Sequence, residues 1–126
     1  MDIIPVIDLK AGRAVHAVAG ERAAYQPLQF SPIPEGDAVA LAAFYAQRQP
    51  PAVYVADLDA IEGEPPQIDL WRQIASVAAC PLWIDCGFRS AESLFPLLPF
   101  FQQPTDHRPS VILGTETLPS PNEILL

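Results

Sequence analysis

Basic residues and cysteines are scarce in this sequence, and each shortage excludes a class of function. Seven Lys and Arg side chains stand against fifteen Asp and Glu, which gives a net charge of −8 and a pI near 4.4. A surface of this charge repels nucleic acids and anionic membranes, so we expect neither as a partner. The two cysteines, Cys80 and Cys86, cannot form the disulfide framework of a small secreted protein.

Long apolar runs are missing as well. The longest of them fall far short of the about 20 residues that a membrane-spanning helix needs. Residues 1–5 do not combine a basic region with an apolar one, so they do not resemble a secretion signal. We therefore expect a cytoplasmic protein that makes no contact with a membrane.

What remains is the composition of one globular domain. The chain has 126 residues, of which 50% are hydrophobic and 17% are charged, and this fits a single domain over residues 1–126. Proline is frequent, with 15 residues, and four prolines fall in the segment 95–109. Because proline removes a backbone donor and clashes inside a helix, we expect no helix of normal length in that segment.

Four apolar, β-branched runs alternate with segments of helical character. The runs are continuous, as is typical of strands that are covered on both faces. They occupy residues 3–7, 52–56, 82–84 and 111–113. Apolar residues at helical spacing, or a capping residue, mark the segments 38–49, 67–79 and 90–94. This alternation predicts an α/β fold with a parallel sheet.

The segment between the first strand and the first helix is unusually long. Gly12 is typical of a turn, and residues 14–19 have the pattern of a short return strand. Residues 25–36, which are rich in proline and glutamine, then predict a long loop. Long loops in compact domains usually serve a function or contact a partner.

Three of the four predicted strands end on an aspartate, namely Asp8, Asp57 and Asp85. Ligands of parallel α/β folds bind at the carboxyl ends of the strands, so we expect these carboxylates to converge on one face. Like charges in a desolvated site raise carboxyl pKa values, and a raised pKa suits a general acid or base near neutral pH. Two other interpretations stay open: each aspartate caps the backbone that follows it, or all three bind Mg²⁺.

Residues 3–15 resemble the opening of the histidine-biosynthesis barrel family, which holds phosphoribosylformimino-5-aminoimidazole carboxamide ribotide isomerase and the cyclase subunit of imidazole glycerol phosphate synthase. The matching residues include Asp8, Lys10, Gly12, Arg13 and Val15. Segments similar to the second, third and fourth strand motifs of the family follow in order at residues 55–60, 87–90 and 112–115. The resemblance implies an eight-stranded (β/α) barrel, of which this chain supplies a four-stranded parallel (β/α)4 N-terminal half.

The resemblance also implies a partner and a reaction. An isolated half-barrel leaves its first and last strands unpaired, so we expect association with a second copy or with a complementing half-barrel. The implied reaction is an Amadori-type aldose–ketose isomerisation, for which no cofactor is expected. An aspartate ending the first strand and another ending the fifth act as acid and base in the family. Asp8 matches the first and is the candidate catalytic residue, whereas Asp57 or Asp85 would have to replace the second.

Family members bind a substrate phosphate through backbone N–H groups that follow the third and fourth strands, where glycine allows close approach. Gly87 and the pair Gly114 and Thr115 match these positions, and Arg89 adds a positive charge. The resemblance thus implies a small phosphorylated metabolite as substrate. The candidate substrate-binding residues are Asp57, Asp85, Gly87, Arg89, Gly114 and Thr115.

The phosphate region departs from the family pattern. Asp85 and Cys86 stand where glycine is typical, and Glu116 follows Thr115. A carboxylate close to a phosphate opposes it by on the order of 1 kcal/mol, which argues against a bisphosphate substrate. A binding or assembly subunit that has lost the reaction is therefore one alternative function. A Mg²⁺-dependent enzyme that uses the three aspartates is another.

Overall fold

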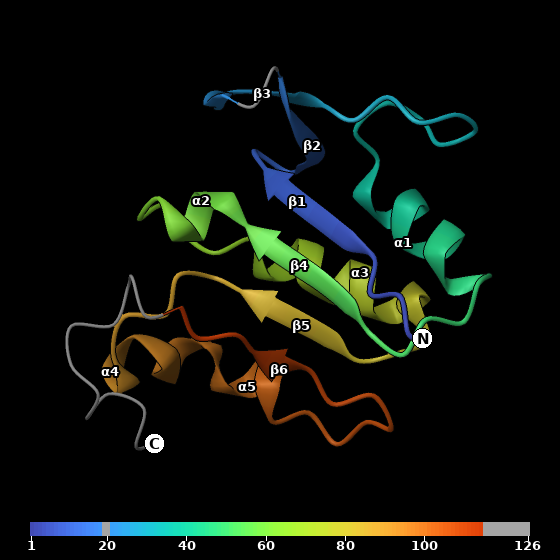
Figure 1. Cartoon of the computed structure of the whole chain (residues 1–126). Coiled ribbons are helices and arrows are strands. Elements are labelled where there is room, and N and C mark those ends of the chain that lie inside the picture. Colours follow the sequence, from blue (N-terminus) through green and yellow to red (C-terminus); the bar gives the residue numbers. More distant parts are fainter. Residues whose placement is uncertain (19–20, 115–126) are drawn as a thin grey trace.

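The computed structural model describes residues 1–18 and 21–114, which form one sheet and a set of short helices (Figure 1). The strands are β1 (Val6–Lys10), β2 (Arg13–Val18), β3 (Glu21–Pro27), β4 (Val53–Asp57), β5 (Leu82–Asp85) and β6 (Ser110–Val111). Their order across the sheet is β3–β2–β1–β4–β5–β6. β1, β4, β5 and β6 are parallel, whereas β2 and β3 pair antiparallel. The expectation of a four-stranded parallel sheet is therefore corrected, because a hairpin extends the sheet beyond β1.

Two strands differ in extent from the apolar runs that predict them. β1 begins at Val6, directly after Pro5, whose missing N–H cannot join a strand ladder. β6 comprises only two residues, although Ile112 N still donates to Ile84 O at 2.8 Å. The return strand predicted after the first turn is confirmed as β2. β3 instead covers the start of the segment that the sequence predicts as a long loop.

The helices are short, and two of them begin at the residues that the sequence predicts as caps. They are α1 (Ala38–Ala46), α2 (Leu58–Ile61), α3 (Ile68–Ala78), α4 (Ala91–Leu94) and α5 (Leu98–Phe101), with the 3-10 helix η1 (Phe95–Leu97) before α5. Asp37 caps α1 by accepting a hydrogen bond from Ala40 N at 2.9 Å. Ser90 and Ser93 form a capping box at α4. The proline-rich segment holds only single-turn helices, as predicted.

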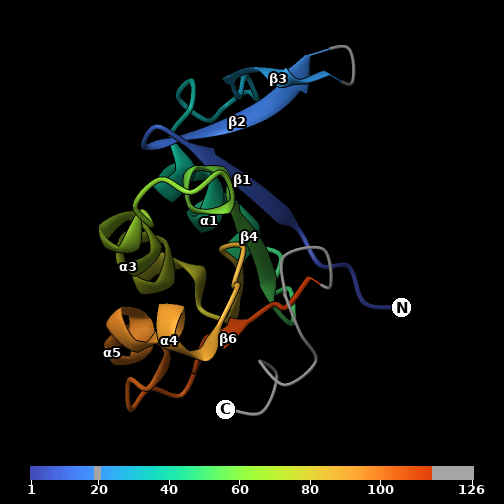
Figure 2. The same cartoon turned by 90° about the vertical axis from the view of Figure 1, so that its left-hand side faces the viewer.

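The hydrophobic core lies between the sheet and the helices, all on one side of the sheet (Figure 2). Ile7 and Leu9 of β1 point into it and are at most 1% exposed. Trp71 of α3 packs edge-on against Phe100 of α5, with ring centroids 5.4 Å apart. No helix among the described residues is long and apolar enough to cross a membrane.

The opposite side of the sheet, which we call the open face, has no described helix over it (Figure 2). Side chains alternate along a strand, so Val6 and Asp8 of β1 lie on this face while their neighbours enter the core. In the strand register Val6 lies opposite Tyr54 of β4, and Tyr54 lies opposite Trp83 of β5. Val6 and Trp83 are 49% and 37% exposed, so apolar surface remains uncovered by the described chain.

The two outer parallel strands, β1 and β6, are not fully paired on the side that faces away from β4 and β5. β2 pairs with β1 from Asp8 to Lys10, and Val6 and Ile7 have no partner in β2. β6 is the last strand in the described sheet. Backbone N–H and C=O groups of such edges are available to another strand.

Candidate active site

The strand register brings Asp8 and Asp85 to the same row of the open face. Asp8 of β1 lies opposite Ala56 of β4, and Ala56 lies opposite Asp85 of β5. All three strands run parallel, so this row lies at their common carboxyl end. Two of the three predicted aspartates therefore share one face, with the methyl group of Ala56 between them.

Asp8 is half-buried on the open face. Loss of water around the carboxyl group raises its pKa above the ordinary value of 3.8. Burial also raises the pKa of Tyr45, and the negative charge of Asp8 adds to that shift. A carboxyl group with a raised pKa holds a proton at a higher pH than usual, which suits an acid catalyst.

Asp85 is fixed by two donors. The Tyr54 hydroxyl donates to Asp85 Oδ2 at 2.5 Å, and Gly87 N donates to Asp85 Oδ1 at 3.3 Å. Tyr54 stands two residues before Ala56 on β4, on the same face of the sheet. The Asp85 carboxylate is thus held from the neighbouring strand and from the loop that follows its own strand.

Asp57 does not join the other two aspartates, and the expectation that all three converge is wrong. Its side chain lies on the helix side of the sheet and is 0% exposed. The carboxylate accepts four hydrogen bonds of 2.7–3.0 Å. The donors are Ala60 N, Gln67 N, Gln67 Nε2 and Trp71 Nε1. For this aspartate the capping interpretation is correct, because Asp57 is the N-cap of α2.

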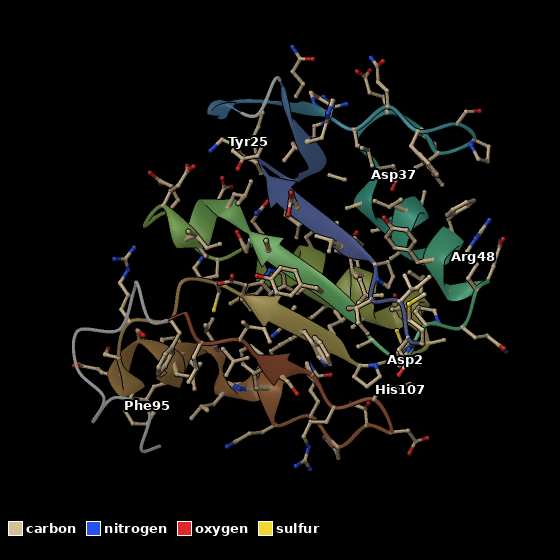
Figure 3. The ribbon with its side chains drawn as sticks, viewed as in Figure 1. Asp2, Tyr25, Asp37, Arg48, Phe95 and His107 are labelled. Atoms are coloured by element: carbon tan, nitrogen blue, oxygen red, sulfur yellow. The ribbon has the colours of Figure 1, made fainter. Side chains whose placement is uncertain are left out.

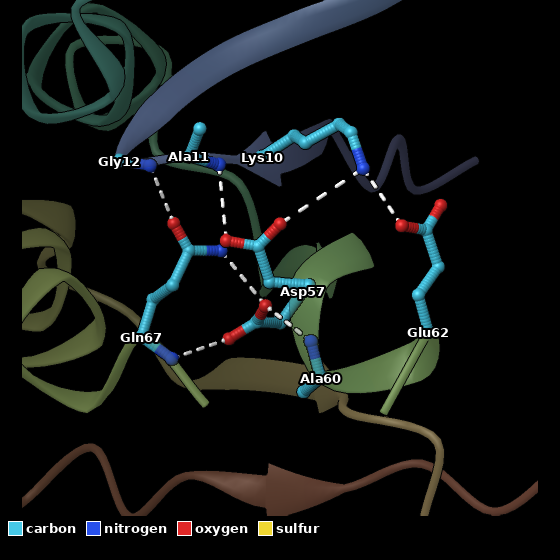
Figure 4. A network of polar contacts seen from close by, with 8 residues as sticks. Lys10, Ala11, Gly12, Asp57, Ala60, Glu62 and Gln67 are labelled. Carbon is cyan, nitrogen blue, oxygen red and sulfur yellow. Dashed lines mark hydrogen bonds and ion pairs between the residues drawn. The ribbon is translucent and has the colours of Figure 1, made fainter. Parts of the chain in front are cut away.

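The hydrogen bonds of Asp57 continue into the turn between β1 and β2 (Figure 4). Gln67, which binds Asp57, also accepts a hydrogen bond from Gly12 N at 2.7 Å. Asp59 Oδ2 accepts from Ala11 N at 3.1 Å. Lys10 Nζ lies 2.7 Å from Glu62 Oε2, and this hydrogen bond raises the Lys10 pKa. These contacts hold the turn against the start of α2 and the segment before α3.

Gln67 and Trp71 were not among the residues that the sequence singled out. A buried indole N–H needs an acceptor, and Trp71 is predicted to lie on the core side of its helix. That requirement is a signal that pairs the tryptophan with a buried carboxylate. The sequence does not identify which aspartate accepts this hydrogen bond, because Asp57 comes next to α3 only in the folded chain.

Gly87 and Arg89 lie in the loop after β5, beside a cavity of about 210 Å³ that they line together with Glu64 and Ser93. Gly87 has a φ of +66°, and a Cβ at this position would lie 2.9 Å from Ile61 Cα. The Arg89 guanidinium donates to Ile61 O at 3.0 Å. The sequence-predicted loop residues are therefore close together, although Gly87 N already has a partner in Asp85.

Two more of the predicted residues follow β6. Gly114 is half-buried and is the last residue that the structure describes. Thr115 lies outside the described residues, as does Glu116.

The remaining polar groups take no part in this row. Burial, together with the charges of Asp57 and Asp85, raises the pKa of Cys86 to about 12, so this thiol stays protonated. Asp2, Arg48 and His107 lie at the amino-terminal end of the parallel strands (Figure 3).

Among the described residues, no three His, Cys, Asp or Glu side chains lie close enough to hold a metal ion. The alternative in which all three aspartates bind one Mg²⁺ does not fit this arrangement, because Asp57 lies on the other side of the sheet from Asp8 and Asp85.

Comparisons with known proteins find a matching family and several related sequences. Residues 2–124 match the model of the family described as histidine biosynthesis protein. An isomerase of Dehalococcoides mccartyi, which acts on 1-(5-phosphoribosyl)-5-((5-phosphoribosylamino)methylideneamino) imidazole-4-carboxamide by its name, is 36% identical over 122 residues. The isomerase of the same name from Roseiflexus castenholzii is 32% identical over 125 residues. An uncharacterized protein of Methanocaldococcus jannaschii is 34% identical over 118 residues.

The chain spans about half the length of these curated relatives. The alignments cover 96%, 98% and 94% of this chain, but only 46%, 48% and 49% of the respective relative.

Proposed function

Because this chain belongs to the histidine biosynthesis protein family, we propose that it forms half of the active site of an aldose–ketose isomerase. The reaction is an Amadori-type isomerisation of a small phosphorylated sugar in the cytoplasm, and Asp8 acts as acid and base. One observation carries this proposal: Asp8 lies on the open face at the carboxyl end of the parallel strands, with its pKa raised by burial.

A second half-barrel, either another copy of this chain or a complementing chain, would close the site. The exposed Val6 and Trp83 side chains on the open face support this arrangement. The outer edge of β6 offers backbone groups to a further strand, whereas Val6 O of β1 already accepts a hydrogen bond from the Tyr45 hydroxyl at 3.2 Å. The phosphate would bind beside the loop after β5. There Arg89 supplies a positive charge, and Gly87, which has no side chain, lets the backbone approach the phosphate closely.

The test measures isomerisation of the substrate named in the isomerase of Dehalococcoides mccartyi. The chain is assayed alone and mixed with the separately produced C-terminal half of that relative. We expect turnover, and we expect Asp8→Asn to lower kcat by at least about 100-fold, as removal of a general acid–base group does. Asp2→Asn is the matched control, because Asp2 is exposed at the other end of the strands. Equal turnover by Asp8→Asn and the unmodified chain would contradict the role of Asp8.

A non-catalytic binding subunit is the second candidate, and the contact of Gly87 favours it. Gly87 N donates to the Asp85 carboxylate at 3.3 Å, so a phosphate must displace an acidic group to reach this amide. If the reaction has been lost, neither preparation turns over the substrate. Binding of ribose 5-phosphate, measured by calorimetry, would then separate a binding subunit from a chain without affinity for phosphorylated sugars.

A further inference from the structure

We propose that Asp85, positioned by Tyr54, is the second proton-transferring carboxylate of the site, so that this chain alone supplies both an acid and a base. This inference rests on the proposed isomerase function and assigns the group that acts opposite Asp8.

Of the three strand-terminal aspartates, Asp85 is the one that shares the open face with Asp8. Asp57 lies on the helix side, and four donors already occupy its carboxylate oxygens. Asp8 and Asp85 share the open face and the same row across β1, β4 and β5. A substrate on that face can contact both of them and cannot reach Asp57.

The spacing of the two carboxylates suits a substrate that lies between them. One strand separates β1 from β5, and neighbouring strands lie about 4.8 Å apart, so the two Cα atoms are on the order of 10 Å apart. Ala56 occupies the middle position with a single methyl group. Inverting glycosidases, which use one carboxyl as acid and another as base, likewise place the two groups several ångströms apart so that the reacting groups fit between them.

Tyr54 gives the Asp85 carboxylate a fixed direction. Its hydroxyl donates to Oδ2 at 2.5 Å, a short contact for an O–H···O⁻ hydrogen bond. Gly87 N holds the other oxygen. Each carboxylate oxygen has a second lone pair, which stays available to a C–H or O–H proton of a ligand. Tyr54 is therefore a positioning residue that acts through Asp85.

The proton balance of the isomerisation requires two such groups. Protonated Asp8 gives its proton to the ring oxygen while the C1–O bond breaks and the nitrogen lone pair forms a C=N bond. The Asp85 carboxylate takes the C2 proton, the C2–H electron pair forms the C1=C2 bond, and nitrogen regains its lone pair. The enol O–H proton then passes to Asp8 and the Asp85 proton passes to C1, which yields the ketose and restores both groups.

The test uses the full chain alone, at a concentration of several hundred micromolar, with the aminoaldose substrate carrying hydrogen or deuterium at C2. We expect turnover with a primary isotope effect, and a loss of at least about 100-fold in kcat for Asp85→Asn. Asp106→Asn is the matched control, because Asp106 is an exposed aspartate in a loop far along the chain from the row. Circular dichroism of each variant verifies that it is folded.

Tyr54→Phe separates positioning from a merely structural role. We expect a loss of about tenfold in kcat with an unchanged KM, a larger isotope effect and a displaced acidic limb of the pH–rate profile, because that limb reports the base. A change in thermal stability with an unaltered pH profile and isotope effect would show that Tyr54 only supports the fold.

The outcomes distinguish this proposal from the proposed function. Full turnover by Asp85→Asn overturns the inference and leaves Asp8 as the catalytic residue. Turnover by the mixture with a complementing half, but none by the chain alone, also overturns it and keeps the isomerase function. No turnover in either preparation overturns both.

Discussion

At the scale of single residues, Asp57 combines complete burial with four hydrogen bonds to its carboxylate. Replacement by alanine leaves the indole N–H of Trp71 and the donors of Gln67 without acceptors in the core. Each unsatisfied buried donor costs about 1–3 kcal/mol. The chain therefore needs this carboxylate for stability, independently of any ligand.

We predict that Asp57→Ala lowers the free energy of unfolding by about 3–5 kcal/mol, because several buried donors lose their acceptor. Urea unfolding followed by tryptophan fluorescence measures the change. Asp69→Asn is the control, because the Asp69 side chain is 93% exposed and forms only a surface ion pair with Arg72. An Asp57→Ala midpoint equal to that of the unmodified chain would show that the hydrogen bonds do not stabilise the fold.

The pKa of Asp8 makes stability depend on pH with a definite sign. Burial raises the carboxyl pKa in the folded state, so the folded chain binds more protons than the unfolded chain just above pH 3.8. Stability from this group is therefore greatest at low pH and falls as pH rises through the folded pKa. We predict that Asp8→Asn raises the melting temperature at pH 7 and leaves it unchanged at pH 3. A melting temperature difference that does not vary between pH 3 and pH 8, measured against Asp2→Asn, would refute this.

The sequence identifies the strand-terminal aspartates but not the face on which each lies. Asp8, Asp57 and Asp85 all follow apolar runs, and the family resemblance gives each the same expected place. The strand register sets Asp57 beside Leu9, a core residue, and sets Asp8 and Asp85 beside Ala56. A shift of one residue in strand pairing exchanges the two faces, and nothing local in the sequence determines that shift.

At the scale of secondary-structure elements, the loop after β5 depends on the glycine that begins it. Gly87 has a positive φ and lies against the backbone of Ile61. This loop both carries Arg89 and supplies the N–H that holds Asp85. Its backbone conformation therefore controls the position of two candidate site residues.

We predict that Gly87→Ala costs more stability than Gly12→Ala. Both positions have positive φ, which costs a residue with a Cβ about 1–2 kcal/mol. A Cβ at Gly87 would lie 2.9 Å from Ile61 Cα, whereas nothing lies within 4 Å of one at Gly12. Urea unfolding measures the loss of stability in each variant, and the difference between the two losses is the cost of the close contact with Ile61. Equal losses for both would mean that the loop moves away from α2 without penalty.

The order of the four parallel strands and of the helices α1, α3 and α4 between them was predictable, because each depends on local signals. Apolar runs, Asp37 and Ser90 indicate the parallel strands and two helix starts that the structure contains. β3 was not predicted, since residues 21–27 include no β-branched residue. That segment becomes a strand because β2 offers it a partner, and such a tertiary effect overrides local preference.

At the scale of the whole molecule, the described residues form a sheet that helices cover on one face only. Trp83 exposes 37% of its surface on β5, next to the edge strand β6, and helices cover only the other side of the sheet. Exposed apolar surface of this kind marks an interaction site. Self-association is therefore expected to depend on the open face rather than on the helices.

We predict that the chain sediments as a dimer at micromolar concentration and that Trp83→Glu shifts it to a monomer. Phe95→Glu provides the control, because Phe95 is 65% exposed and follows α4 on the helix side. Analytical ultracentrifugation of the three proteins measures the change. Dimers that persist in Trp83→Glu but not in Phe95→Glu would assign the contact to the helices instead.

The hydrogen bond between Gly12 N and Gln67 joins residues that are 55 positions apart in the chain. While the chain emerges from the ribosome, the first turn has no acceptor for this amide until the start of the third helix has been synthesised. Amide hydrogen exchange at Gly12 will thus report the arrival of α3 rather than the closing of the hairpin. The first strand, which carries Asp8, is therefore synthesised early, but the turn that follows it gains this hydrogen bond only late.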